Sequence, residues 1–142
     1  GSTPRPLARI ASGGELSRLA LAVVVSTLSD GGGAPTLIFD EIDAGIGGAV
    51  GDTVGALLAR IGSQRQVLAV THLAQVAAGA DHHYVVSKVQ HEGRACSAVA
   101  TIDGPMREQE IARMLGGESA GRTSLAHARA MLHDAAQRRS AA

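Results

Sequence analysis

Two short apolar runs, each ending in polar residues, constrain the fold more than any other feature of this sequence. The first is TLIFD at Thr36–Asp40 and the second is QVLAVT at Gln66–Thr71. Continuous apolar runs of this length are typical of strands buried on both faces of a parallel sheet. Between them, Ala49–Ile61 has the apolar spacing of a helix. A strand, a helix and a second strand in this order predict a crossover connection, a parallel sheet and an α/β fold.

The rest of the chain predicts further helices and a hairpin around this unit. We expect helices at 15–28, 73–78, 106–115 and 124–137, strands at 84–89 and 96–102 joined as a β-hairpin, and a frayed tail from Arg138. The predicted architecture is therefore a mostly parallel sheet flanked by helices, followed by a β-hairpin and C-terminal helices, in one segment covering residues 1–142.

Composition and charge exclude several classes of protein. The 142 residues carry 13 basic and 13 acidic side chains, so no global field attracts nucleic acid or anionic lipid. No apolar run approaches the roughly 18 residues of a membrane span, and the N-terminus has no signal-peptide pattern. We therefore expect a cytoplasmic protein with no membrane partner. Cys96 is the single cysteine and cannot form an internal disulfide.

Two adjacent acids follow the first apolar run. Asp40 and Glu41 stand where ligands gather in α/β sheets, beyond the carboxyl end of a strand. Successive strand residues point to opposite sides, so one acid of the pair can contact a metal ion while the other contacts a water molecule. Asp40 suits a Mg²⁺ ion that keeps several of its waters, and Glu41 suits orienting or deprotonating an attacking water. The competing interpretation is a solvated turn.

His72 follows the second apolar run and is expected at the same edge of the sheet, where an imidazole can donate to a phosphate oxygen. A strand-end histidine is also compatible with a structural or merely exposed side chain. The remaining histidines have no assigned role. His82 and His83 beside Asp81 are also residue types that bind metals, but no third ligand has suitable spacing.

The segment IASGGELSRL opens the first predicted helix. Ser12 and Glu15 have the spacing of a capping box, in which each side chain satisfies a free backbone N–H group of the helix start. A cap requires neither Gly13 nor Gly14. Glycines at a helix start let backbone amides approach an anion closely, so this segment also predicts a phosphate contact.

Taken together and in this order, the motifs resemble the second half of an ABC-type ATPase head. SGGE resembles the signature motif, LIFDE the Walker B strand, the following IDAG turn the D-loop, and TH the switch histidine. Within that superfamily the chain is most similar to bacterial DNA repair proteins related to the SMC proteins. ARMLGG and SLAHARAML, which lie outside the ATP motifs, also resemble segments of those proteins, and the resemblance extends from about Pro6 to Leu132.

The resemblance implies a role for each motif residue. Asp40 would hold Mg²⁺, Glu41 would polarise the hydrolytic water, and His72 would contact the γ-phosphate of ATP. Asp43 and Gly45 would form the loop that couples two heads. The signature residues would contact nucleotide held by the opposite head; these are Ser12, Gly13, Gly14 and Glu15.

The resemblance also implies partners. ATP would be sandwiched between two heads of a homodimer, and the full-length protein would act on DNA at double-strand breaks in the nucleoid. The chain contains no GxxxxGK[ST] phosphate loop, no glutamine loop and no coiled coil. We therefore expect the C-terminal part of a head from a longer natural chain, with its N-terminal part as partner. Alone, the chain is expected not to bind ATP appreciably and to expose apolar surface where that partner docks.

Two alternatives stay open. A truncated half-head could serve only for dimerisation or docking, without catalysis. The motifs are also shared by other SMC-like heads and by transporter ATPase subunits.

Overall fold

The computed structural model describes residues 19, 21–23, 26, 34–91 and 94–140. These residues divide into two compact units between Val76 and Ala77. The predicted helix 15–28 falls largely outside the described residues, but those within it are helical. The signature residues Ser12 to Glu15 also lie outside them.

The first unit is built on a pair of parallel strands. Strand β1 (Thr36–Phe39) pairs with β2 (Gln66–Ala69), with Thr36 opposite Gln66 and Phe39 opposite Ala69. Helix α2 (Gly48–Gly62) joins the two strands, as the strand–helix–strand pattern predicts. The short helix α3 (Ala74–Ala78) follows β2. Both strands end earlier than predicted, which leaves Asp40 and Thr71 beyond the ladder.

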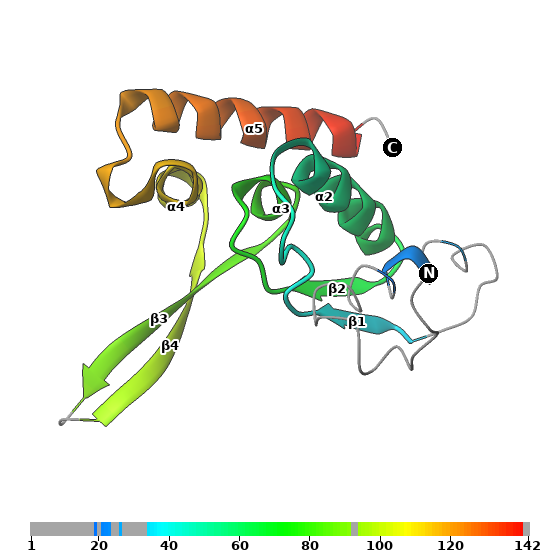
Figure 1. Ribbon diagram of the computed structural model, residues 1–142, viewed down its shortest axis with the longest axis horizontal. Helices are drawn as coiled ribbons and strands as arrows, with labels where there is room; N and C mark the ends of the chain where they lie inside the picture. Colours follow the sequence, from blue (N-terminus) through cyan, green and yellow to red (C-terminus); the bar gives the residue numbers. More distant parts are fainter. Residues whose placement is uncertain (1–18, 20, 24–25, 27–33, 92–93, 141–142) are drawn as a thin grey trace, which may run out of the picture. The chain divides into compact units, whose positions relative to one another are not determined.

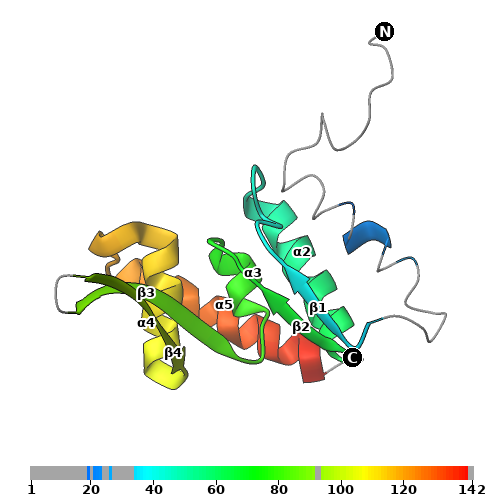
Figure 2. The ribbon, with the colours of Figure 1, turned by 90° about the horizontal axis from the view of Figure 1, so that it is seen from below.

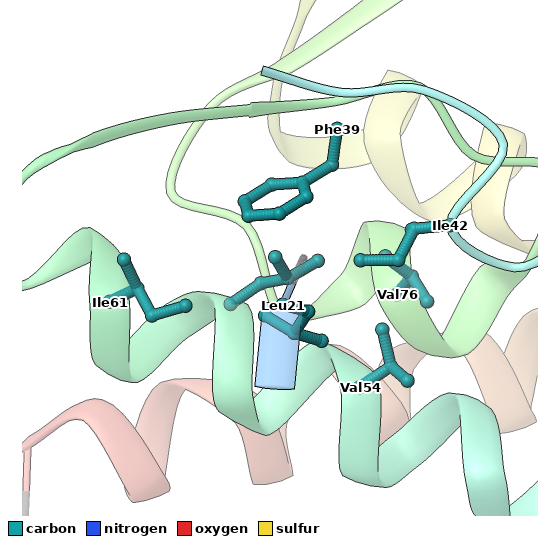
Figure 3. Close-up of a cluster of buried hydrophobic side chains, with 7 residues drawn as sticks. Leu21, Phe39, Ile42, Val54, Ile61 and Val76 are labelled. Atoms are coloured by element: carbon teal, nitrogen blue, oxygen red, sulfur yellow. The ribbon is translucent and has the colours of Figure 1, made fainter. Parts of the chain in front are cut away.

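Helix α2 covers one face of the strand pair (Figure 1). The buried cluster between them contains Leu21, Phe39, Ile42, Val54, Leu58, Ile61 and Val76; Figure 3 shows Phe39 facing the apolar side chains of α2. The helix also approaches the start of α3 closely, because a Cβ atom at Gly55 would lie 2.9 Å from the Gln75 carbonyl oxygen.

The other face of the strand pair, toward the viewer in Figure 2, carries exposed apolar side chains. Ile38, Leu68 and Val70 are 70%, 44% and 61% exposed, and Ile38 pairs directly with Leu68. The apolar runs predict strands that need neighbours on both faces, and in the described part of the chain α2 packs on one face only. The related expectation of exposed apolar surface is confirmed.

The second unit contains the hairpin and the C-terminal helices. Strand β3 (His83–His91) pairs antiparallel with β4 (Arg94–Ile102) over nine residues each, so the predicted hairpin is confirmed with longer strands. It extends well beyond the helices of its own unit (Figure 1). Helix α4 (Gly104–Gly116), the 3₁₀ turn η3 (Gly117–Ser119) and helix α5 (Arg122–Ser140) follow. Ile111, Ala112, Ala128 and Ala135 are buried within this unit.

Two arginines bind the turn that precedes the hairpin. The Arg107 guanidinium donates to the carbonyl oxygens of Ala77, Ala78 and Ala80 at 3.2, 3.3 and 2.6 Å. Arg139 donates to the Gly79 carbonyl at 3.1 Å and lies 3.3 Å from an Asp81 carboxylate oxygen. The predicted frayed tail from Arg138 is therefore wrong: α5 continues to Ser140, and Arg139 is tied to the turn by these contacts.

Candidate functional site

The carboxyl ends of β1 and β2 form the candidate site. The two strands are parallel and in register, and the ladder continues one step beyond them because Val70 N–H donates to the Phe39 carbonyl at 2.9 Å. Asp40 and Glu41 therefore leave the sheet at the same edge as Thr71 and His72. Asp40, Glu41 and His72 are all exposed there. The structure thus brings the two predicted acids and the predicted histidine to one edge of one sheet.

Glu41 has an unusual backbone conformation. Its φ is +53°, in the left-handed region that non-glycine residues adopt rarely and at a cost of roughly 1–2 kcal/mol. The turn is closed by Ala44 N–H donating to the Glu41 carbonyl at 3.0 Å. It reverses the chain directly after the strand, so that Ile42 enters the core while Glu41 stays exposed. Such outliers cluster at functional sites, where the surrounding packing holds them in place.

Asp43 is almost completely buried, with 1% of the residue exposed. A single carboxylate oxygen, Oδ2, accepts hydrogen bonds from the Thr71 hydroxyl, from His72 N–H at 2.8 Å and from Leu73 N–H at 3.1 Å. The Leu73 N–H group also approaches Thr71 Oγ1 at 3.0 Å. One buried carboxylate therefore fixes the segment that follows β2.

These contacts decide the charge of Asp43. Burial alone would raise the pKa of its carboxyl group, because it disfavours the charged form. Hydrogen bonds from Thr71, from the His72 backbone and from its own backbone, together with the nearby His72 ring, outweigh burial and lower the pKa below its ordinary value. Asp43 is thus a carboxylate at neutral pH.

His72 stands against this carboxylate while remaining open to solvent. Its Nδ1 lies 3.2 Å from Asp43 Oδ2, and its side chain is 71% exposed. The carboxylate thus lies beside one ring nitrogen, and Nε2 is on the opposite side of the ring. Such an arrangement can orient an imidazole toward a group outside the protein.

Gly45 and Gly48 shape the loop between Asp43 and α2. Both have positive φ, +72° and +51°, so the loop uses a conformation that glycine adopts without strain. Between them Ile46 packs against the core cluster, and its N–H donates to the Asp43 carbonyl at 3.2 Å. Gly45 itself is exposed.

Sequence reasoning missed Thr71 as a site residue and did not foresee that Asp43 is buried. A signal was present in IDAGI, where two isoleucines bracket the aspartate and draw the loop toward the core. For Thr71, the signal in the sequence was a hydroxyl residue directly after an apolar run and before His72.

Within the described residues, no group of three or more His, Cys, Asp or Glu side chains is placed to hold a metal ion. The Asp81–His83 segment is described and forms no such group. They also contain no helix both long and apolar enough to cross a membrane.

Comparison with known proteins establishes the family. No protein-family model matches the chain. It is, however, 55% identical over 117 residues to the DNA repair protein RecN of Xylella fastidiosa, an alignment covering 82% of this chain and 21% of that protein. For RecN of Deinococcus radiodurans the identity is 52%, covering 89% of this chain and 22% of the relative. For RecN of Treponema pallidum it is 47%, covering 98% and 24%. The chain belongs to the RecN family.

The chain spans between a fifth and a quarter of the length of these RecN relatives. A solved SMC ATPase, described for its ATP-driven dimerization and DNA-stimulated activation, has the same fold. The TM-score is 0.51 at 24% sequence identity, over 78% of this chain and 65% of that one. The predicted fold class, an α/β part of an ABC/SMC-type ATPase head, is confirmed for this RecN family member.

Proposed function

We propose that this chain supplies the C-terminal part of the ATP-binding and ATP-hydrolysing head of a RecN-type protein that acts in recombinational repair of DNA double-strand breaks. The observation that carries the proposal is the shared strand edge. There Asp40 and Glu41 follow one parallel strand, His72 follows the other, and Asp43 links the two. Its membership of the RecN family supports the same function.

In this proposal the strand-edge residues divide the chemistry of hydrolysis. Glu41, exposed on its strained turn, orients and deprotonates the attacking water. Asp40, an exposed carboxylate at the end of β1, would be one ligand of Mg²⁺. Mg²⁺ is commonly bound by one or two carboxylates with waters and substrate phosphates, so a single protein carboxylate fits it. His72 contacts the γ-phosphate. When bound, the ion would neutralise charge on the phosphates.

The site is proposed to be completed by a second head. Ser12, Gly13, Gly14 and Glu15 would contact ATP held by the partner head, and the Asp43–Gly45 loop would lie at the junction. The Asp43 side chain is occupied within its own chain. We therefore assign the contact with the second head to the exposed Gly45 end of the loop, and to Asp43 the support of that loop.

The N-terminal part of the same protein is the proposed partner of the exposed apolar sheet face. Ile38, Leu68 and Val70 form an exposed apolar patch on strands that, within the described residues, α2 covers from one side, and such patches mark interaction sites. DNA and the nucleoid would be reached through the complete protein. The same patch also supports the second candidate, a module that docks or dimerises without catalysis.

Glu41→Gln in the complete protein separates these functions. Removing the base should lower the rate of ATP hydrolysis about 10²- to 10⁴-fold, while ATP binding by calorimetry stays unchanged. Gln adopts the Glu41 backbone conformation as readily as Glu, so the fold should not change. Asp52→Asn, which removes an exposed acid on α2, is the matched control and should hydrolyse ATP at the normal rate. Undiminished turnover in Glu41→Gln would remove Glu41 from this role and favour the docking module.

A further inference from the structure

We propose that Asp43 is a positioning residue for His72 and sets the tautomer of its imidazole. In the neutral ring the proton is on Nδ1, the nitrogen that lies beside Asp43 Oδ2, and Nε2 carries no proton. The assignment rests on the 3.2 Å separation of the two atoms and on the contrast in exposure, 2% for the Asp43 side chain and 71% for the His72 side chain.

The chemistry of the two groups decides where the proton lies. An ionised carboxylate only accepts hydrogen bonds. Oδ2 already accepts from the Thr71 hydroxyl and from the His72 and Leu73 N–H groups, which excludes a proton on that oxygen. A lone pair on Nδ1 facing the same oxygen would be repelled, whereas Nδ1–H is attracted to it. The carboxylate beside one ring nitrogen thereby sets the state of the other.

The support for this arrangement is rigid. The backbone N–H groups of His72 and Leu73 are held by the same oxygen that faces the ring. Asp43 itself is anchored between Ile42, which is fully buried, and Ile46, which packs on the core. The exposed His72 ring therefore lies against a buried, charged side chain, Asp43, on the preceding loop.

The tautomer has one consequence for the γ-phosphate contact of His72, and this consequence rests on the proposed function. A bare Nε2 accepts a hydrogen bond, for example from water. It donates to a phosphate oxygen only after the ring gains a second proton, and the Asp43 carboxylate then pairs with the resulting positive charge. Contact with the γ-phosphate would therefore involve the charged imidazole ring.

The test is long-range ¹H–¹⁵N correlation spectroscopy of the chain labelled with ¹⁵N-histidine, recorded without nucleotide at pH 8, where an ordinary imidazole is neutral. A His72→Gln spectrum identifies the His72 signals. We expect the Nδ1–H pattern for His72. The Nε2–H pattern in the unmodified chain would overturn the proposal.

Two variants test whether Asp43 is the cause. Asp43→Ala removes the acceptor, so the Nδ1–H pattern of His72 should be lost in favour of Nε2–H. Thr71→Val removes one donor to the carboxylate but leaves the ring contact, and should retain the Nδ1–H pattern. A tautomer that survives Asp43→Ala in a folded chain, or changes in Thr71→Val, would contradict the assignment. If Asp43→Ala fails to fold, the unmodified chain and Thr71→Val still decide it. Because no nucleotide is used, the outcome is independent of the hydrolysis assay of Glu41→Gln.

Discussion

His83 is a half-buried histidine at the start of β3. Its Nδ1 is buried and has no hydrogen-bond partner in the part of the chain that the structure describes. Burial, and then the positive charge of Arg107, lower the pKa of His83 below 6.5, although the Glu110 carboxylate opposes them. Folding therefore favours the neutral ring.

This lowered pKa predicts how stability changes with pH. Because the unfolded chain takes up the proton more readily, the stability contributed by neutral His83 is complete above pH 6.5 and is lost as the pH falls toward the folded-state pKa. Urea unfolding between pH 8 and pH 5 should show this loss, at no more than about 1.4 kcal/mol per pH unit for one proton.

The variant that checks this is His83→Gln, which should flatten the pH dependence over that range. His127→Gln removes an exposed histidine on α5 and should leave the dependence unchanged. An identical pH profile for His83→Gln and the unmodified chain would show that His83 is not the responsible group.

Helix α2 lies close to the start of α3 at Gly55. A Cβ atom at Gly55 would meet the Gln75 carbonyl at 2.9 Å and the Val76 Cα atom at 3.3 Å, both backbone atoms. Alanine in a helix interior is favoured over glycine by about 1 kcal/mol. Overpacking against backbone costs about 1–3 kcal/mol, so the clash should exceed this gain.

Gly55→Ala should therefore lower the free energy of unfolding, by up to about 2 kcal/mol after the helix gain is subtracted. The matched control is Gly62→Ala at the end of the same helix, where nothing lies within 4 Å of the added Cβ; it should be neutral or slightly stabilising. Equal or greater stability for Gly55→Ala in chemical denaturation would show that the contact between α2 and α3 can relax freely.

The spacing of apolar residues along the chain was sufficient to predict the helices and strands, but not the tertiary contacts that surround them. Helix α2 and the hairpin follow from local apolar spacing, which depends on neighbours along the chain. The contacts of Arg139 with the turn at Gly79 and Asp81 could not be read from local pattern, since they join residues about 60 positions apart. Which face of the sheet α2 covers could not be read from local pattern either, because periodicity does not say how many layers cover a sheet.

The same distinction holds for the candidate site. The positions of Asp40, Glu41 and His72 beyond strand ends follow from the sequence alone, because the topology of parallel strands places them at one edge. The burial of Asp43 and its bonds to the Thr71–Leu73 segment depend on a tertiary contact across about 30 residues. The left-handed turn at Glu41 likewise has no signal in residue type, since glutamate does not favour it.

For the whole molecule, the apolar sheet face is the proposed junction with the rest of the protein. Ile38 is 70% exposed in this chain, so Ile38→Asp should leave the chain alone folded by circular dichroism. In complex with the remainder of a full-length RecN-type protein the same aspartate would be buried without a partner, which costs several kcal/mol. Binding measured by calorimetry should weaken at least 100-fold. Lys88→Asp, on the exposed hairpin, is the control and should bind normally.

We propose that this chain is one part of a composite ATPase head. The most direct measurement is ATP turnover by the chain mixed with the remainder of the full-length protein, supplied as a separate polypeptide. We expect no turnover by the chain alone, turnover in the mixture, and loss of that turnover when the chain carries Glu41→Gln. Micromolar ATP binding by the chain alone, or a stable complex whose turnover is unaffected by Glu41→Gln, would contradict it.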